Sequence, residues 1–158
     1  MSDRAQSSAD LIQAFNDAVL AFVDRCSEEA WHKTCSDEDW NVGVVARHIA
    51  AGHFQAIGMA QTILRGEALP ALTMDQVIEL GNAHARDHAD CTREEVQTLL
   101  KKNGDAAVAF VAQLSDEELD CKGQLDLFGG DVSVEQLVNH VIIQSGGEHL
   151  SSMQAAIG

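Results

Sequence analysis

The sequence predicts an all-α protein, an up-down four-helix bundle with a short loop or hairpin before its last helix. Three observations predict this fold. Apolar residues recur at helical spacing along most of the 158 residues. Four polar clusters have the spacing of a helix capping box. Aromatic residues make up only 4% of the chain, with no Tyr, which is low for a β-sandwich or barrel.

The first long helix is expected over residues 7–29 and the second over 41–66, with Asn41 as the N-cap of the second. Both segments follow the i, i+3/i+4, i+7 rule of a helix with one apolar face. Their apolar stripes consist of Leu11, Phe15, Ala18 and Phe22, and of Val45, Ile49, Gly52, Ala56, Met59 and Ile63.

Further helices are expected over residues 74–90, 92–114 and 133–156, the first two forming one interrupted element of the bundle. In a capping box, the first and fourth residues satisfy each other's backbone donors. The four matching pairs are Thr73–Gln76, Thr92–Glu95, Ser115–Glu118 and Ser133–Gln136. Between residues 125 and 132, Gly129–Gly130 predicts a small hairpin or loop. Long helices with short links pack as a bundle, so one domain is expected over residues 1–158.

Charge and cysteine usage narrow the class of partner. Acidic residues number 25 and basic residues 10, for a net charge of −15. This balance argues against a nucleic-acid partner and against an anionic membrane surface. No apolar run approaches the ~18 residues of a membrane span, and the polar N-terminus lacks the apolar run of a secretory signal. The four cysteines form no C-x-x-C pair, so free, mostly buried thiols in a reducing cytoplasm are expected.

Two histidines lie on or near buried stripes. His48 lies beside apolar residues of the second long helix, and His149 extends the stripe of the last helix. Ser145 precedes His149 by four residues, so their side chains lie about 40° apart on one face. The three would converge at one end of the bundle, where bundle cores commonly hold metals. The alternative is that each imidazole is a hydrogen-bonded core residue.

The remaining histidines favour structural interpretations. His84 and His88 have the i, i+4 spacing of a chelating pair, but Arg86 lies between them, and a partly exposed surface pair is favoured. Surface or rim positions are expected for three others, His32, His53 and His140.

Three further features of the sequence also have structural interpretations. Gly146–Gly147 inside a predicted helix indicates a close helix–helix approach or room beside a pocket. Trp31 and Trp40 are expected to plug one bundle end. The acidic run over residues 37–39 is interpreted as a solvated turn.

Several runs resemble the DinB/YfiT-like superfamily, which includes the mycothiol-dependent maleylpyruvate isomerases. The run from Trp40 to Ala50, WNVGVVARHIA, resembles the family's second-helix motif. The tail from Glu148 to Met153, EHLSSM, resembles its last-helix signature. Three further runs resemble the middle segment of the family's proteins. They are GNAHARDHA from Gly81, Asn103-Gly104, and LSDEEL from Leu114.

The resemblance implies a four-helix bundle, often dimeric, with a divalent metal such as zinc or nickel held by three side chains. One ligand is a His that matches His48. The other two lie at i, i+4 in the last helix, and the second of them matches His149. The first falls on Ser145, a departure that matters because a neutral hydroxyl is a poorer zinc ligand than imidazole or carboxylate.

Three hypotheses follow. The first is a metal-dependent thiol transferase, isomerase or hydrolase acting on a small molecule, with a low-molecular-weight thiol as a further cofactor. His48 and His149 would be ligands, Ser145 a weak ligand or hydrogen-bond donor, and Asn82 and His84 part of the cofactor-binding pocket. The second is a metal-free, catalytically degenerate bundle that binds a small ligand or acts as a dimeric stress-response protein. The third is an interaction module with an exposed apolar face. A cytoplasmic homodimer is expected.

Overall fold

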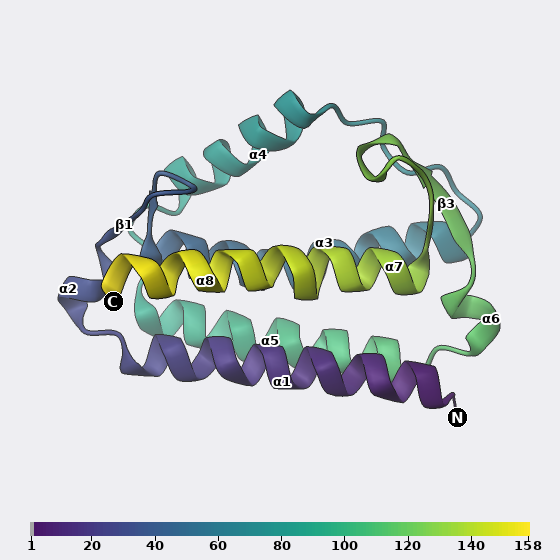
Figure 1. Ribbon diagram of the computed structural model, residues 1–158, viewed down its shortest axis with the longest axis horizontal. Coiled ribbons are helices and arrows are strands. Elements are labelled where there is room, and N and C mark those ends of the chain that lie inside the picture. Colours follow the sequence, from purple (N-terminus) through teal and green to yellow (C-terminus); the bar gives the residue numbers. More distant parts are fainter. Residues whose placement is uncertain (1) are drawn as a thin grey trace.

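The computed structural model describes residues 2–158 and shows four long helical elements packed side by side (Figure 1). Three are single helices, α1 (Asp3–Arg25), α3 (Val42–Leu64) and α5 (Arg93–Ala112). The fourth is a continuous rod of α7 (Val134–Val138), the π-helix η2 (Asn139–Ser145) and α8 (Gly146–Ile157). The predicted all-α four-helix bundle is therefore confirmed. The segments 74–90 and 92–114, expected to form one interrupted element, are instead separate, and only the second is a helix of the bundle.

Shorter elements connect the four. They are α2 (Glu28–Trp31), α4 (Met74–Asp87), α6 (Asp116–Leu119) and the 3-10 turn η1 (Asp126–Phe128). The expected hairpin before the last helix is formed by β3 (Lys122–Leu125) and β4 (Gly130–Ser133), with Gly129 left-handed at φ 85°. A second strand pair that the sequence did not indicate, β1 (Thr34–Cys35) and β2 (Trp40–Asn41), lies before α3.

Helix starts follow the capping chemistry. All four predicted capping boxes are formed, and the Asn41 side chain accepts the Val44 backbone N–H. The first helix was expected over residues 7–29, but α1 begins at Asp3 and ends at Arg25. It begins earlier because Ser2 is the N-cap, and it ends earlier because Cys26 is extended. Ser27 then caps the separate turn α2.

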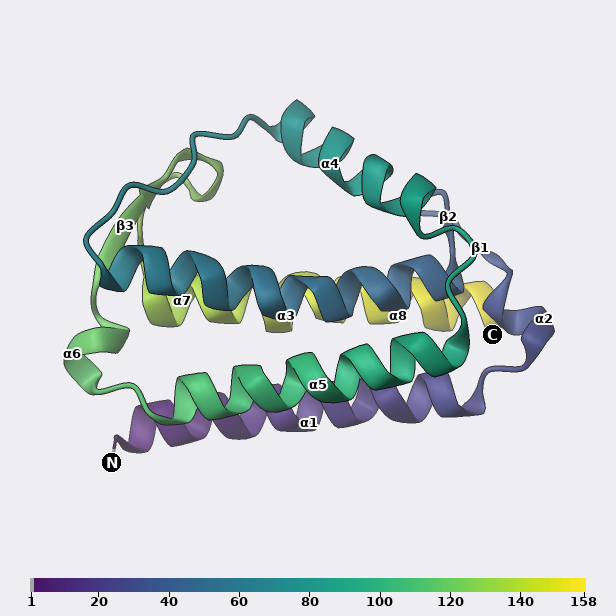
Figure 2. The same ribbon diagram turned by 180° about the vertical axis from the view of Figure 1, so that it is seen from behind.

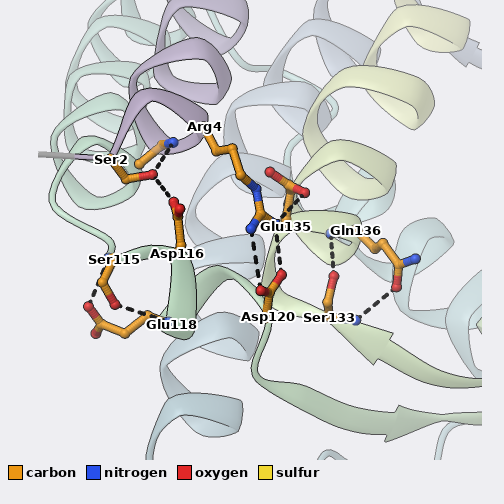
Figure 3. A network of polar contacts seen from close by, with 10 residues as sticks. Ser2, Arg4, Ser115, Asp116, Glu118, Asp120, Ser133, Glu135 and Gln136 are labelled. Carbon is orange, nitrogen blue, oxygen red and sulfur yellow. Dashed lines mark hydrogen bonds and ion pairs between the residues drawn. The ribbon is translucent and has the colours of Figure 1, made fainter.

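One end of the bundle is joined by a surface network of charged and polar side chains (Figure 3). Arg4 of α1 pairs with Asp120, at 2.7 Å, and with Glu135 of α7, at 3.0 Å. Ser2 hydrogen-bonds to Asp116 of α6. These contacts connect the N-terminus with the two elements that flank the hairpin β3–β4.

The chain crosses over between α3 and α5. Trp31 fills the space beside Gly43 of α3, and its indole N–H donates to the Cys91 carbonyl, just before α5. The starts of α3 and α5 therefore lie at the same end, and the two helices run in the same direction, whereas a simple up-down order would make them antiparallel (Figures 1 and 2). The segment between α3 and α5 must therefore return along the bundle. It contains α4, whose main packing contact is with α3.

His53 is a correction to the sequence analysis. It was expected at the surface or rim, but it is fully buried, and its Nε2 lies 2.9 Å from Asn16 Oδ1 of α1. The Asn16 amide donates to the Leu100 carbonyl of α5, so Oδ1 accepts the His53 Nε2–H. The prediction failed because α3 is covered on more than one side, by α5 and by the last rod, so its buried surface is wider than one stripe.

The glycine pair in the last rod divides between the two interpretations. A Cβ on Gly146 would lie 2.6 Å from the Phe15 ring of α1, so this glycine permits a close helix–helix approach. A Cβ on Gly147 would meet nothing within 4 Å. Trp31 is buried at the end of the bundle as expected.

Candidate functional site

A cavity of about 710 Å³ lies between α3, α4, the hairpin β3–β4 and the last rod. Its volume is within the range of small-molecule sites, and most of its lining is apolar. His48, His84, Ser145 and His149 all line it. The structure thus brings four of the five predicted site residues to one cavity.

His48 and His149 face each other across the α3–α8 contact. Their ring centres lie 5.0 Å apart and the rings are perpendicular. Two imidazoles bound to one tetrahedral ion at roughly 2.0–2.1 Å have ring centres about 5 Å apart. The spacing of this pair is therefore compatible with a shared metal ion.

Glu38, from the turn between β1 and β2, fixes His149. His149 Nδ1 lies 2.9 Å from Glu38 Oε1, and the Ser152 hydroxyl donates to Oε2 at 2.7 Å. The Glu38 side chain is only 8% exposed. The carboxylate accepts the Nδ1–H and orients the ring, as in carboxylate–histidine–metal arrangements.

Sequence reasoning missed Glu38 because it interpreted residues 37–39 as a solvated turn. The tight β1–β2 pair, with Asp39 left-handed at φ 60°, returns the chain so that Glu38 meets α8. No signal in the sequence indicated a contact between residues 111 positions apart.

His84 belongs to the same cluster. Its ring centre lies 5.6 Å from that of His48 and 4.8 Å from that of His88. Its Nε2 accepts a hydrogen bond from Arg47 at 2.8 Å. Since a guanidinium only donates, the His84 proton is on Nδ1, and within residues 2–158 this buried Nδ1 has no hydrogen-bond partner. His84 is thus an N–H donor, and it forms with His88 the partly exposed pair that was expected.

Burial keeps two of these imidazoles neutral. Desolvation lowers the pKa of His48 to about 4, with further lowering from His149 and His84. Burial, followed by the Arg47 charge, lowers the pKa of His84 to about 4. Near pH 7 both rings are uncharged, the state in which imidazole binds metals or donates a single N–H.

Asn82 lies apart from the main cavity. Its side-chain oxygen accepts the Trp40 indole N–H at 3.1 Å, and both residues line a separate, shallower depression. The Trp40 ring in turn lies edge-on to His48, with centres 5.2 Å apart. Asn82 therefore contacts the site through Trp40.

Two side chains of the cluster are suitable ligands for one metal ion. His48 and His149 are suitable ligands, and Ser145 adds a hydroxyl that lines the same cavity. His84 does not extend the set while Arg47 holds its Nε2. The part of the chain that the structure describes contains no group of three His, Cys, Asp or Glu residues that could hold a metal ion.

Fold and site together define a helical-bundle protein with an imidazole-bearing cavity. The family model described as "DinB superfamily" matches residues 11–146, and the chain belongs to this superfamily. The matched residues include His48 and Ser145, and His149 follows three residues after their end.

A solved structure supports the same fold. YfiT from Bacillus subtilis, described as a probable metal-dependent hydrolase with an unusual four-helix bundle topology, superposes with a TM-score of 0.80 at 13% identity. The alignment covers 99% of this chain and 87% of that one. Among the curated proteins nothing matches. None of the helices within residues 2–158 is long and apolar enough to cross a membrane.

Proposed function

We propose that this protein is a metal-dependent enzyme that acts on a small molecule bound in the cavity between α3, α4 and α8. The observation that carries the proposal is the pair His48 and His149, 5.0 Å apart at the cavity wall, with His149 held by Glu38. The description of YfiT as a probable metal-dependent hydrolase supports a metal in general.

Each residue has a distinct role in this proposal. His48 and His149 hold a divalent metal, zinc or nickel, which supplies Lewis-acid chemistry when bound. Glu38 fixes the tautomer of His149. Ser145 offers a hydroxyl to the substrate or to solvent beside the two rings. The reaction is a hydrolysis, or a transfer or isomerisation that uses a low-molecular-weight thiol.

The second candidate is a metal-free bundle that binds a small ligand. Ser145 favours it, because this residue stands where the family pattern has a His or Glu ligand. Two imidazoles bind a divalent ion more weakly than three do, and Gln144, Glu148 or water would have to supply the third donor. The expected homodimer and cytoplasmic location apply to both candidates and stay predictions.

Metal binding distinguishes the two. The protein would be purified without chelator, reconstituted with zinc or nickel, and analysed for bound metal and by calorimetry. We expect about one ion per chain, lost in His48→Ala and His149→Ala and kept in His32→Ala, a control because His32 is exposed and paired only with Glu28.

The complementary variant is Ser145→His. If the wild type bound no metal after reconstitution and Ser145→His bound it tightly, the metal-dependent proposal would be wrong and the degenerate site supported. If the wild type already bound one ion and Ser145→His changed the metal affinity little, the coordination shell of the metal would be complete without a third imidazole.

A further inference from the structure

The apolar stripe of α4 is only partly covered by the rest of the described chain. None of the 14 residues of this helix is buried. Val77, Leu80, Gly81 and His84 nevertheless share one face and line the cavity. Val77 remains 37% exposed and Leu80 59% exposed. A ligand that covers these side chains removes their apolar surface from water, which favours its binding.

The opposite wall has glycines that no packing contact explains. Gly52 and Gly58 of α3 both line the cavity, and a Cβ at either would meet nothing within 4 Å. Glycine is less favourable than alanine inside a helix. At Gly43, Gly104 and Gly146 a neighbouring side chain occupies the space where a Cβ would be. At Gly52 and Gly58 that space belongs to the cavity.

The cavity is long and differs at its two ends. On α3 its lining extends from His48 to Thr62, a helical length of about 21 Å. Its volume of about 710 Å³ over that length gives a mean cross-section of roughly 34 Å². One extended hydrocarbon chain fits within this section along its whole length. The end near the start of α3 has His48, His84 and His149, whereas the other end is mainly apolar. It is lined by Leu69, Pro70, Leu125, Leu127 and Phe128, with the His140 ring beside Phe128.

The imidazole end has an unpaired hydrogen-bond donor. His84 Nδ1–H is buried and has no acceptor within residues 2–158. Leaving a buried donor unpaired is unfavourable, so a ligand oxygen at this end would be favourable. The carboxylate of Glu38 is already bonded to His149 and Ser152, and Glu148 lines the cavity but makes no hydrogen bond to His84.

We propose that the cavity binds a linear acyl compound, with its carbonyl end at His48, His84 and His149. The hydrocarbon chain lies between α4 and the glycines of α3 and ends at the hairpin β3–β4. This inference names the substrate class of the proposed function and rests on it for any chemistry. Binding of the hydrocarbon chain requires only the cavity and no bound metal.

The test is a homologous series of linear carboxylates, from butyrate to dodecanoate, and their methyl esters. Their affinities would be measured by calorimetry on the full chain, both metal-reconstituted and chelator-treated. Each buried CH₂ contributes about 0.8 kcal/mol, so we expect affinity to rise roughly fourfold per carbon until the chain fills the cavity. Affinity that does not rise with chain length would overturn the inference.

Two glycine variants test where the hydrocarbon chain of the ligand lies. Gly58→Leu places a side chain inside the cavity and is expected to weaken binding of dodecanoate while leaving butyrate unchanged. Gly147→Leu is the matched control, because Gly147 also has open space around it but does not line the cavity. If Gly58→Leu did not fold, Leu80→Asp on exposed α4 would replace it, with the same expected loss. Equal effects at positions 58 and 147 would contradict the proposed path.

The two proposals fail separately. Rising affinity along the series in a protein that binds no metal would support the acyl-chain cavity and contradict the metal-dependent function. One bound ion per chain together with no dependence on chain length would support the metal site and contradict the acyl chain.

Discussion

The buried imidazole of His53 predicts a loss of stability in mild acid. The ring is 0% exposed and donates Nε2–H to Asn16, and burial lowers its pKa to about 4. In the unfolded chain the pKa of a histidine is about 6.5. Between these two values the unfolded state binds more protons, so stability falls as pH falls through this window.

The magnitude follows from the two pKa values. Lowering the pH from 7.5 to 5 favours the unfolded state by about 2 kcal/mol through His53 alone, at 1.36 kcal/mol per pKa unit. Urea unfolding of the wild type and of His53→Gln would be measured at both pH values. Glutamine keeps an N–H donor for Asn16 but does not titrate.

The difference between the two proteins isolates His53, because all other titrating groups are shared. We expect the pH-dependent loss of unfolding free energy to be about 2 kcal/mol smaller in His53→Gln. His32→Gln, at an exposed position, controls for the loss of one histidine side chain. The reasoning is refuted if His53→Gln and the wild type lose the same free energy between pH 7.5 and 5.

Three further predictions concern single positions. Glu38→Gln weakens metal binding by about 10–100-fold, because His149 loses its carboxylate partner. The control Asp37→Asn, at an exposed neighbouring position, leaves metal binding unchanged. Equal metal affinities of the two variants in a titration would contradict this prediction. Gly104→Ala destabilises the protein by about 1–3 kcal/mol, because the added Cβ would overlap the Asn16 side chain. Gly147→Ala, which has open space around the added Cβ, is neutral or stabilising. A thermal unfolding measurement that ranks the two variants in the opposite order would be inconsistent with this packing. Of the four thiols, Cys121 is exposed and the other three are buried, so one thiol per folded chain reacts with a maleimide and four react after unfolding; rapid labelling of more than one would disprove this burial pattern.

Local chemistry made the helices predictable. A capping box needs only two residues three positions apart, so Thr73–Gln76 and Thr92–Glu95 were readable from the chain alone. The apolar stripes likewise require only a period near 3.6 residues. The hairpin at Gly129–Gly130 was readable because a left-handed backbone favours glycine.

The candidate site was only partly predictable. Stripe positions placed His48 and His149 on faces that meet, and the structure shows their rings 5.0 Å apart. Glu38, the bond from Arg47 to His84, and the buried pair of His53 with Asn16 were not predictable. Each of these contacts joins residues at least 37 positions apart, and no local period describes them.

The sequence by itself determined the helices, their caps, the superfamily pattern and the serine at position 145, because these depend on neighbouring residues and on residue identity. Only the tertiary structure decided that α3 and α5 run in the same direction and that α4 lies over a cavity along α3. It also decided which histidines are buried. The physical reason is that burial depends on how many elements cover a helix, and this number is set by the arrangement of the whole chain.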